Sequence, residues 1–355
     1  MSRFHPLRVA EVIKETPDCV SIAFELDESQ KEDFTFVHGQ YITIKAHLDN
    51  QEVRRSYSIC TSPLEHQLKV AVKRVPDGIF STYANTDLKA GDILEVMPPM
   101  GNFTIGLDAK QTHHYAAIAA GSGITPVLSI MKSVLMTEPD SSFTLFYGNR
   151  NTENIIFHEE IEALKNTYLG RLRIYYVLSR ENTGSDLFYG RIDAEKCDRF
   201  AKYLIDVSKT KAVFVCGPYD MIMSAKESLM EAGMAEDKIH YELFYTPQKG
   251  DKQAESVPAE KGTESNLTIT LDDNTFSFHM ESSDQMILDA ALKAGADLPY
   301  ACKGGVCCTC KAKVLSGEVK MLVNYALEPE EVDAGYVLTC QCIPMTDSVE
   351  ISFDE

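Results

Sequence analysis

The sequence has no run of roughly 18 uninterrupted apolar residues, the length that a membrane-spanning helix needs. Its beginning, MSRFHPLRVAEVIKE, lacks the apolar segment of a secretory signal. An internal repeat of about 20 to 50 residues is also missing, which argues against a solenoid or a propeller. We therefore expect a cytoplasmic globular protein with no membrane partner.

Basic residues are few. The chain has 34 Lys and Arg against 53 Asp and Glu, a formal net charge of -19, and residues 251–355 carry -12 of it. Such a surface disfavours nucleic acid, whose phosphates require Lys and Arg. It suits a basic docking face on a protein partner, or it serves solubility alone.

The length of 355 residues is too great for one ordinary core and suggests two or three domains. Hydrophobic residues make up 44% and charged residues 25%, so large cores can form. We expect three domains, at residues 1–107, 108–247 and 266–355. Residues 248–265 contain almost nothing that can be buried and predict an interdomain linker.

Each domain has its own pattern. Six short alternating segments between residues 7 and 97 predict an antiparallel β-barrel: LRVAEVIKE, VSIAFEL, YITIKA, RSYSIC, LKVAVKR and ILEVM. Apolar segments that alternate with helical patterns then predict an α/β domain with a parallel sheet: YAAIAA, FTLFYG, LRIYYVLS and AVFVCG. In the last region we expect a hairpin around Asn274 and a short helix ended by Gly295.

Six of the ten cysteines fall within 41 residues, and such clustering points to metal rather than to disulfides. The spacing is Cys302-x4-Cys307-x2-Cys310, with Cys340 after 29 intervening residues, which is the pattern of a plant-type [2Fe-2S] site. A structural zinc site is the competitor, but it usually has two Cys-x2-4-Cys pairs. Gly304 and Gly305 suit a loop whose backbone closely approaches a cluster.

Two motifs lie in the predicted barrel. The segment RRSYSIC contains an R-x-Y-S motif formed by Arg55, Tyr57 and Ser58. Alone, it is typical of any half-exposed strand. The segment GIFSTY places Gly78, Ser81 and Thr82 at a helix start, where anions bind, although an isolated turn of this kind is usually only a cap.

Two more motifs lie in the predicted α/β domain. After the strand YAAIAA, Gly121 and Gly123 would let the backbone approach a pyrophosphate, and we expect Thr125 as N-cap and Pro126 at the first helical position. Further on, the triplet CGP closes the strand AVFVCG with Cys216, Gly217 and Pro218. By itself, this triplet indicates a buried structural cysteine before a turn.

Taken in order, these motifs resemble the ferredoxin-NADP reductase superfamily with a plant-type ferredoxin domain at the C-terminus. The resemblance implies that Arg55 pairs with the pyrophosphate of FAD, that Tyr57 packs on the flavin and that Ser58 lies near its N5 atom. It implies four cluster ligands, Cys302, Cys307, Cys310 and Cys340, with Cys308 and Cys342 as spare thiols. Gly78, Ser81 and Thr82 would contact the flavin pyrophosphate.

The same resemblance implies a nicotinamide nucleotide as electron donor. Cys216, Glu242 and Phe244 match residues that approach the reacting rings, so with Ser58 they form the expected catalytic set. Ser179 and Arg180 match a pair that binds the 2'-phosphate of NADPH, and Arg150 could add a second cation. These residues favour NADPH over NADH.

The expected protein is thus a reductase that passes electrons from NADPH through FAD and a 2Fe-2S cluster to an oxygenase component. The resemblance implies that this partner is a diiron oxygenase that epoxidises an aromatic ring; the alternative is a Rieske-type ring- or steroid-hydroxylating enzyme. A pure electron carrier with an inactive front end and a redox-sensing interaction protein are the other two hypotheses.

Overall fold

The computed structural model describes residues 4–244, 262–281 and 286–355. The chain divides into a larger compact unit, residues 4–53 and 57–243, and a smaller one that begins at residue 244 and includes residues 54–56. Within these described ranges, no helix is long and apolar enough to cross a membrane.

The front of the larger unit is an antiparallel sheet with the strand order β4-β3-β6-β1-β2-β5. Its strands are β1 (His5–Thr16), β2 (Cys19–Glu25), β3 (Tyr41–Leu48), β4 (Gln51–Ser58), β5 (Leu68–Lys73) and β6 (Ile93–Val96). Just after β4, Ile59 pairs with Val70 of β5, and the Cys60 amide donates to the Lys69 carbonyl at 2.9 Å. The sheet therefore closes on itself, and the predicted barrel is confirmed.

The interior of this barrel follows from the strand pattern. Along β1, Leu7 and Val9 are buried while the residues between and beside them are exposed, as expected for a strand with one solvated face. Helix α1 (Ile79–Thr86) adds Phe80 and Ala84 to the same core. Each such aliphatic or aromatic burial contributes about 1.5–3 kcal/mol relative to exposure.

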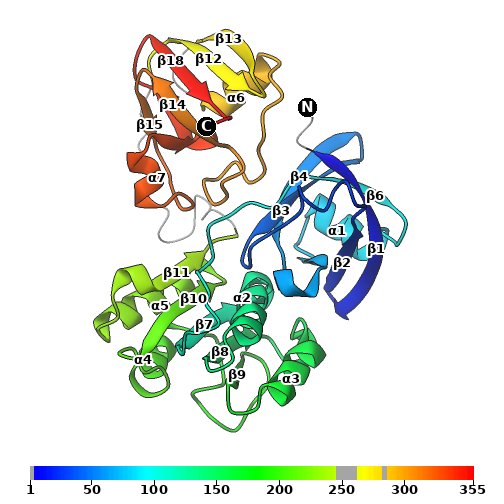
Figure 1. Cartoon of the computed structure of the whole chain (residues 1–355), viewed down its shortest axis with the longest axis vertical. Helices are drawn as coiled ribbons and strands as arrows, with labels where there is room; N and C mark the ends of the chain where they lie inside the picture. The colour runs from blue at the N-terminus through cyan, green and yellow to red at the C-terminus, as the bar shows by residue number, and fades with distance from the viewer. Residues whose placement is uncertain (1–3, 245–261, 282–285) are drawn as a thin grey trace. The chain divides into compact units, whose positions relative to one another are not determined.

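The rest of the larger unit is a parallel sheet with the order β11-β10-β7-β8-β9 and helices on both faces (Figure 1). The strands are β7 (His114–Ala120), β8 (Ser142–Asn149), β9 (Leu172–Leu178), β10 (Thr210–Cys216) and β11 (Ile239–Glu242). The helices are α2 (Ile124–Thr137), α3 (His158–Thr167), α4 (Ala194–Tyr203) and α5 (Tyr219–Glu231). Tyr147 packs in the α2 cluster, whereas its neighbour Phe146 stacks on Phe200 of α4, so these two helices cover opposite faces.

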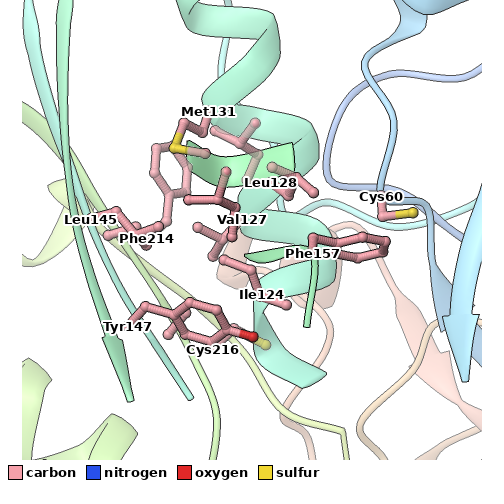
Figure 2. Packing of buried hydrophobic residues seen from close by; sticks show 14 of the residues in the cluster. Cys60, Ile124, Val127, Leu128, Met131, Leu145, Tyr147, Phe157, Phe214 and Cys216 are labelled. Carbon is pink, nitrogen blue, oxygen red and sulfur yellow. The ribbon is translucent and has the colours of Figure 1, made fainter. Parts of the chain in front are cut away.

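Helix α2 supplies the centre of the largest core. Figure 2 shows Ile124, Val127, Leu128 and Met131 on the side of α2 that faces the strands. They pack against Leu145, Tyr147 and Phe214, which come from two different strands. The predicted amphipathic helix after the glycine turn is therefore confirmed, and its packing fixes that turn at the edge of the sheet.

The smaller unit contains a mixed sheet in the order β13-β12-β18-β14-β16 and a separate two-stranded sheet formed by β15 and β17. Its strands are β12 (Ser265–Leu271), β13 (Asn274–Met280), β14 (Lys311–Ser316), β15 (Val319–Met321), β16 (Tyr336–Leu338), β17 (Cys342–Pro344) and β18 (Ser348–Ser352). The helices are α6 (Ile287–Lys293) and α7 (Pro329–Asp333). Helix α6 packs into the core of this sheet, as in an α+β domain.

Two local predictions in this unit need comment. The hairpin is confirmed, but its turn is formed by Asp272 and Asp273 and not by Asn274, because both aspartates adopt the positive φ that a two-residue turn requires. Residues 248–261 of the predicted linker lie outside the described residues. At its end, the Thr263 amide donates to the Pro344 carbonyl at 3.0 Å, so these last residues lie along the smaller unit.

Candidate functional site

The carboxyl ends of three parallel strands meet a strand of the barrel within the larger unit. Cys216 ends β10 and is in register with Glu242 of β11 and with Ala119 of β7. The Ser58 hydroxyl, at the end of β4, donates to Glu242 Oε2 at 3.2 Å. Three of the four residues in the expected catalytic set are thus brought together.

Burial controls the charge at this point. Although Glu242 is half-buried as a residue, loss of water around its carboxyl group raises its pKa to about 8, and the hydrogen bond from Ser58 opposes this only in part. Cys216 is fully buried, and burial with the nearby Glu242 charge raises the pKa of its thiol well above the ordinary value. Near pH 7 the site therefore holds a neutral carboxylic acid and a neutral thiol.

The glycine turn after β7 touches the same place. A Cβ atom at Gly123 would collide with the Cys216 carbonyl oxygen, so only glycine fits. Gly121 adopts a φ of +54°, and its carbonyl accepts a hydrogen bond from the Tyr147 hydroxyl at 3.0 Å. The turn is fixed on one side by the C-G-P segment and on the other by a buried tyrosine.

The predicted cap of α2 is wrong. The chain already winds into a 3-10 turn at Gly121–Gly123, so α2 begins at Ile124 with Gly123 as N-cap. Thr125 lies inside the first turn, where its hydroxyl donates to the Ser122 carbonyl at 3.0 Å, and Pro126 follows it. Because Gly123 has no side chain with which to cap the helix, this N-terminus can receive an anion.

The second predicted phosphate turn opens α1. Gly78 is its N-cap and supplies no side-chain hydrogen bond. The Ser81 hydroxyl closes the turn internally, because it donates to the Gly78 carbonyl and accepts from the Val75 amide, both at 3.2 Å. Thr82 is exposed. Beside this turn, the Tyr57 ring lies 5.6 Å from the Phe80 ring, centroid to centroid.

The remaining predicted nucleotide residues follow strands β8 and β9. The Ser179 amide donates to the Asn149 carbonyl at 2.9 Å, and the Arg180 amide to the Arg150 carbonyl at 2.7 Å. Both arginine side chains are exposed. The ends of two adjacent strands therefore carry two cations side by side.

One cation near the glycine turn escaped the sequence analysis. Lys73 Nζ lies 3.7 Å from the position that a Cβ atom would take at Gly121. It is also 3.8 Å from Asp18 Oδ2. Alternation in LKVAVKR predicts the strand, but no sequence signal indicates which turn the end of that strand will meet.

Four cysteines of the smaller unit form one group of sulfurs. Cys307 Sγ lies 3.1 Å from Cys302 Sγ. Hydrogen bonds with Cys307 and then with Cys340 lower the pKa of the Cys302 thiol, and Cys340 likewise lowers the pKa of Cys310. All four predicted ligands therefore converge. Four thiolates are the donor set that two irons sharing two sulfides require.

The backbone of the cysteine loop fits a cluster as well. The Gly304 amide donates to Cys302 Sγ at 3.3 Å. Gly305 has a φ of +75°, and a Cβ there would lie 3.1 Å from the Val323 carbonyl oxygen. The two predicted glycines thus have separate uses, one as a donor toward sulfur and one as a tight bend.

The other two thiols of this region are directed elsewhere. Cys308 Sγ contacts the Ala326 carbonyl oxygen at 3.3 Å, outside the four-sulfur group. Cys342 is fully buried, and burial raises the pKa of its thiol above the ordinary value. Both placements agree with spare thiols.

The last predicted site residues to be described are Arg55, Phe244 and Pro218. Arg55 is exposed, and its Nη1 donates to the Arg54 carbonyl at 2.7 Å. Phe244 has 40% of its surface exposed. Pro218 is the N-cap of α5 and follows Gly217, whose position would bring a Cβ to 3.1 Å from that of Ala120.

Family models match three parts of the chain. The oxidoreductase FAD-binding domain matches residues 6–105, the oxidoreductase NAD-binding domain 117–227, and the 2Fe-2S iron-sulfur cluster binding domain 269–345. These matches define a flavoprotein oxidoreductase with nucleotide-binding and iron-sulfur domains in one chain.

Full-length relatives narrow this class. The chain is 45% identical to one component protein of the 1,2-phenylacetyl-CoA epoxidase of Escherichia coli, over 100% of this chain and 99% of the relative. It is 33% identical to the ferredoxin reductase component of 3-ketosteroid-9-alpha-monooxygenase of Rhodococcus rhodochrous, over 99% and 97%. The chain belongs to the family of iron-sulfur flavoprotein reductases that serve multicomponent oxygenases and include this component of 1,2-phenylacetyl-CoA epoxidase.

Solved structures share the fold. Phthalate dioxygenase reductase, described as a modular structure for electron transfer from pyridine nucleotides to [2Fe-2S], matches with a TM-score of 0.59 and 22% identity over 99% of this chain and 98% of that one. An intact type IV self-sufficient cytochrome P450 monooxygenase matches with a TM-score of 0.70 and 24% identity, over 98% of this chain and 41% of that one.

Proposed function

We propose that this reductase takes electrons from NADPH and delivers them to a diiron oxygenase that epoxidises phenylacetyl-CoA. The single observation that supports electron transfer through an iron-sulfur cluster is the convergence of four thiols, Cys302, Cys307, Cys310 and Cys340. The choice of oxygenase rests on the 45% identity to the phenylacetyl-CoA epoxidase component. When bound, FAD accepts a hydride, and the cluster carries one electron at a time.

The chain's own residues have separate tasks in this proposal. Ser58 and Glu242 form a neutral hydrogen-bonded pair, which would hold a proton near the reacting edge of a bound flavin without adding a charge there. Cys216, fully buried at the end of β10, would leave room for a nicotinamide ring because its side chain is small. By the resemblance, Phe244 would cover the ring of a bound flavin in the absence of the nucleotide.

The two cofactor phosphates would bind at two helix starts. The turns at Gly78 and Gly121 each precede a helix N-terminus that no side chain of the described residues caps. Gly78, Ser81, Thr82 and Arg55 would hold the flavin pyrophosphate. The 121–126 turn would hold that of NADPH, with Lys73 beside it.

We propose the domain boundaries 1–107, 108–247 and 266–355, with residues 248–265 as a linker. The matched ranges of the three family models lie inside these domains and support the division. We also propose the cytoplasm as compartment, because none of the ten cysteines, all within the described ranges, forms a disulfide, and a reducing environment preserves thiols and the thiolate ligands of a cluster.

A second candidate is the reductase of a Rieske-type or steroid-hydroxylating oxygenase, favoured by the 33% identity to the ketosteroid monooxygenase component. Reconstitution separates the two. The purified protein should support NADPH-dependent epoxidation with the phenylacetyl-CoA oxygenase and give no turnover with the steroid-hydroxylating one. The reverse result would overturn the first candidate.

The reductase activity is tested by anaerobic titration of the full chain with NADPH. We expect flavin bleaching and the electron paramagnetic signal of a reduced [2Fe-2S] cluster. Cys310→Ser should lose the cluster absorbance and that signal while keeping ferricyanide reduction, because the larger unit is intact. Cys308→Ser is the matched control and should keep all three. A Cys310→Ser protein with a normal cluster, or a wild-type protein without flavin, would contradict the proposal.

A further inference from the structure

Two arginines mark the outer end of the proposed nucleotide site. Arg150 follows β8 and Arg180 follows β9, and a backbone hydrogen bond of 2.7 Å joins these two residues. Among the residues that the structure describes, neither guanidinium group has an ion pair or a hydrogen-bond partner. Both side chains are exposed. Two unpaired cations at the carboxyl edge of a parallel sheet are suited to a phosphate group.

A carboxylate lies next to these cations in the chain. Glu181 directly follows Arg180, yet its carboxylate is engaged elsewhere. The Thr152 amide donates to Glu181 Oε2 and the Thr152 hydroxyl to Oε1, both at 2.8 Å. These two hydrogen bonds, first the one from the amide, lower the pKa of Glu181, so the group is ionised at neutral pH. The Glu181 carboxylate is therefore charged, and its two hydrogen bonds with Thr152 fix its position.

The position of that charge matters for the two forms of the nucleotide. A free carboxylate at this end of the sheet would accept hydrogen bonds from a ribose with both hydroxyls and would repel a 2'-phosphate. Held by Thr152, both oxygens of Glu181 already have donors. The arginines are then left to a phosphate without a competing anion.

We propose that Thr152 sets the preference for NADPH over NADH by holding the Glu181 carboxylate away from the Arg150 and Arg180 side chains. Thr152 is a positioning residue in this scheme, since it acts through Glu181 and does not itself contact the nucleotide. The inference rests on the proposed role of Arg180 in binding the 2'-phosphate.

The test compares kcat/KM for NADPH and for NADH in the same flavin-loaded full chain, with ferricyanide as acceptor. Thr152→Val keeps the amide but removes the hydroxyl. We expect the NADPH to NADH ratio to fall roughly two- to fivefold, through KM for NADPH, because a carboxylate held by the amide alone can turn toward the phosphate and repel it. Thr152→Ser should keep the wild-type ratio. Thr167→Val is the matched control, since the Thr167 hydroxyl only bonds its own helix at Ala163.

The double variant Thr152→Val, Glu181→Gln decides whether the charge is responsible. We expect it to recover the wild-type ratio, because the side chain at position 181 is then neutral and cannot repel the phosphate. A ratio that stays within twofold of wild type in Thr152→Val, or a double variant as impaired as the single one, would overturn the inference.

Arg180→Ala distinguishes an error in the role of Thr152 from an error in the assignment of NADPH as donor. We expect a wild-type preference for NADPH that Arg180→Ala abolishes. If that holds and Thr152→Val changes nothing, only the role of Thr152 is wrong. A wild-type protein that prefers NADH, or an Arg180→Ala variant with an unchanged ratio, would overturn the 2'-phosphate site itself.

Discussion

The protonation state of Glu242 depends on its surroundings and cannot be inferred from its residue type. In HYELF it is one acidic residue on a short strand, and an exposed glutamate there would be ionised at pH 7. Burial beside Cys216 instead raises its pKa to about 8, although the hydrogen bond from Ser58 opposes this rise. The raised pKa makes the neutral form the resting state of the site.

This raised pKa predicts a pH dependence of stability. Between the ordinary value of 4.5 and about 8, the folded protein holds a proton that the unfolded chain has released, so stability should fall as pH rises through this window. In Glu242→Gln this contribution should vanish, which flattens the curve. Urea unfolding of the wild type and the variant between pH 5 and 9 measures it. Parallel curves for the two proteins would show that the carboxyl group is not protonated in the folded state.

At the scale of elements, helix α2 joins the two halves of the larger unit through polar side chains. The Ser129 hydroxyl donates to the Thr61 carbonyl at 2.6 Å, and the Ser133 and Ser62 hydroxyls lie 2.8 Å apart. Lys132 is buried, and its Nζ lies 2.9 Å from Glu65 Oε1; it also pairs with Glu160 of α3. Helix α2 is thus fixed to the segment at residues 61–65, which follows β4.

Removing the buried cation should therefore destabilise the protein. Lys132→Met leaves two carboxylates without their partner, and we expect a loss of roughly 1–3 kcal/mol in the free energy of unfolding. Adding Glu65→Gln to that variant should recover part of the loss. Lys165→Met, which removes an exposed lysine paired within its own helix, should change stability by less than about 0.5 kcal/mol. Equal losses in the two lysine variants would show that the buried contacts contribute nothing special.

These contacts also mark the limit of the sequence analysis. Periodicity in α2 predicts which apolar residues face the sheet, and the strands, the barrel and the four-thiol group follow from local patterns and spacing. The partners of Ser129, Lys132 and Ser133 depend on which distant turn meets the helix, and no periodic pattern holds that information. The misplaced cap at Thr125 has a related cause, because the glycines before it can start the winding earlier than side-chain preferences indicate.

At the scale of the whole molecule, charge is the most uneven property. Residues 251–355 carry -12 of the net -19. On the smaller unit, Glu330 and Asp333 are exposed on α7, shortly after Tyr325, whose amide donates to Gly305 of the cysteine loop at 3.0 Å. We propose this acidic region as the face that a basic oxygenase surface recognises.

If this acidic region binds the oxygenase, salt should affect electron transfer to the oxygenase and leave the earlier steps unchanged. Turnover with the oxygenase should fall as ionic strength rises, while ferricyanide reduction at saturating NADPH should change little. Glu330→Gln with Asp333→Asn should lower the oxygenase rate at low salt roughly two- to fivefold. The control is Asp140→Asn on the larger unit, where an exposed acid is also lost. Oxygenase turnover that is indifferent to both salt and the double variant would remove the electrostatic argument.

The hydroxyl and lysine contacts between α2 and the turn at residues 61–65 have one more consequence. Separating the barrel from the parallel sheet would leave several desolvated polar groups without partners at once, so we expect these two parts to unfold as one unit. The iron-sulfur domain can then be altered to suit a new electron acceptor, while the FAD- and NAD-binding domains are left unchanged. For protein engineering, a junction after residue 244 keeps the barrel and the parallel sheet together, but a recombined domain must preserve the contacts that Arg54 makes with Asp297 and Leu298.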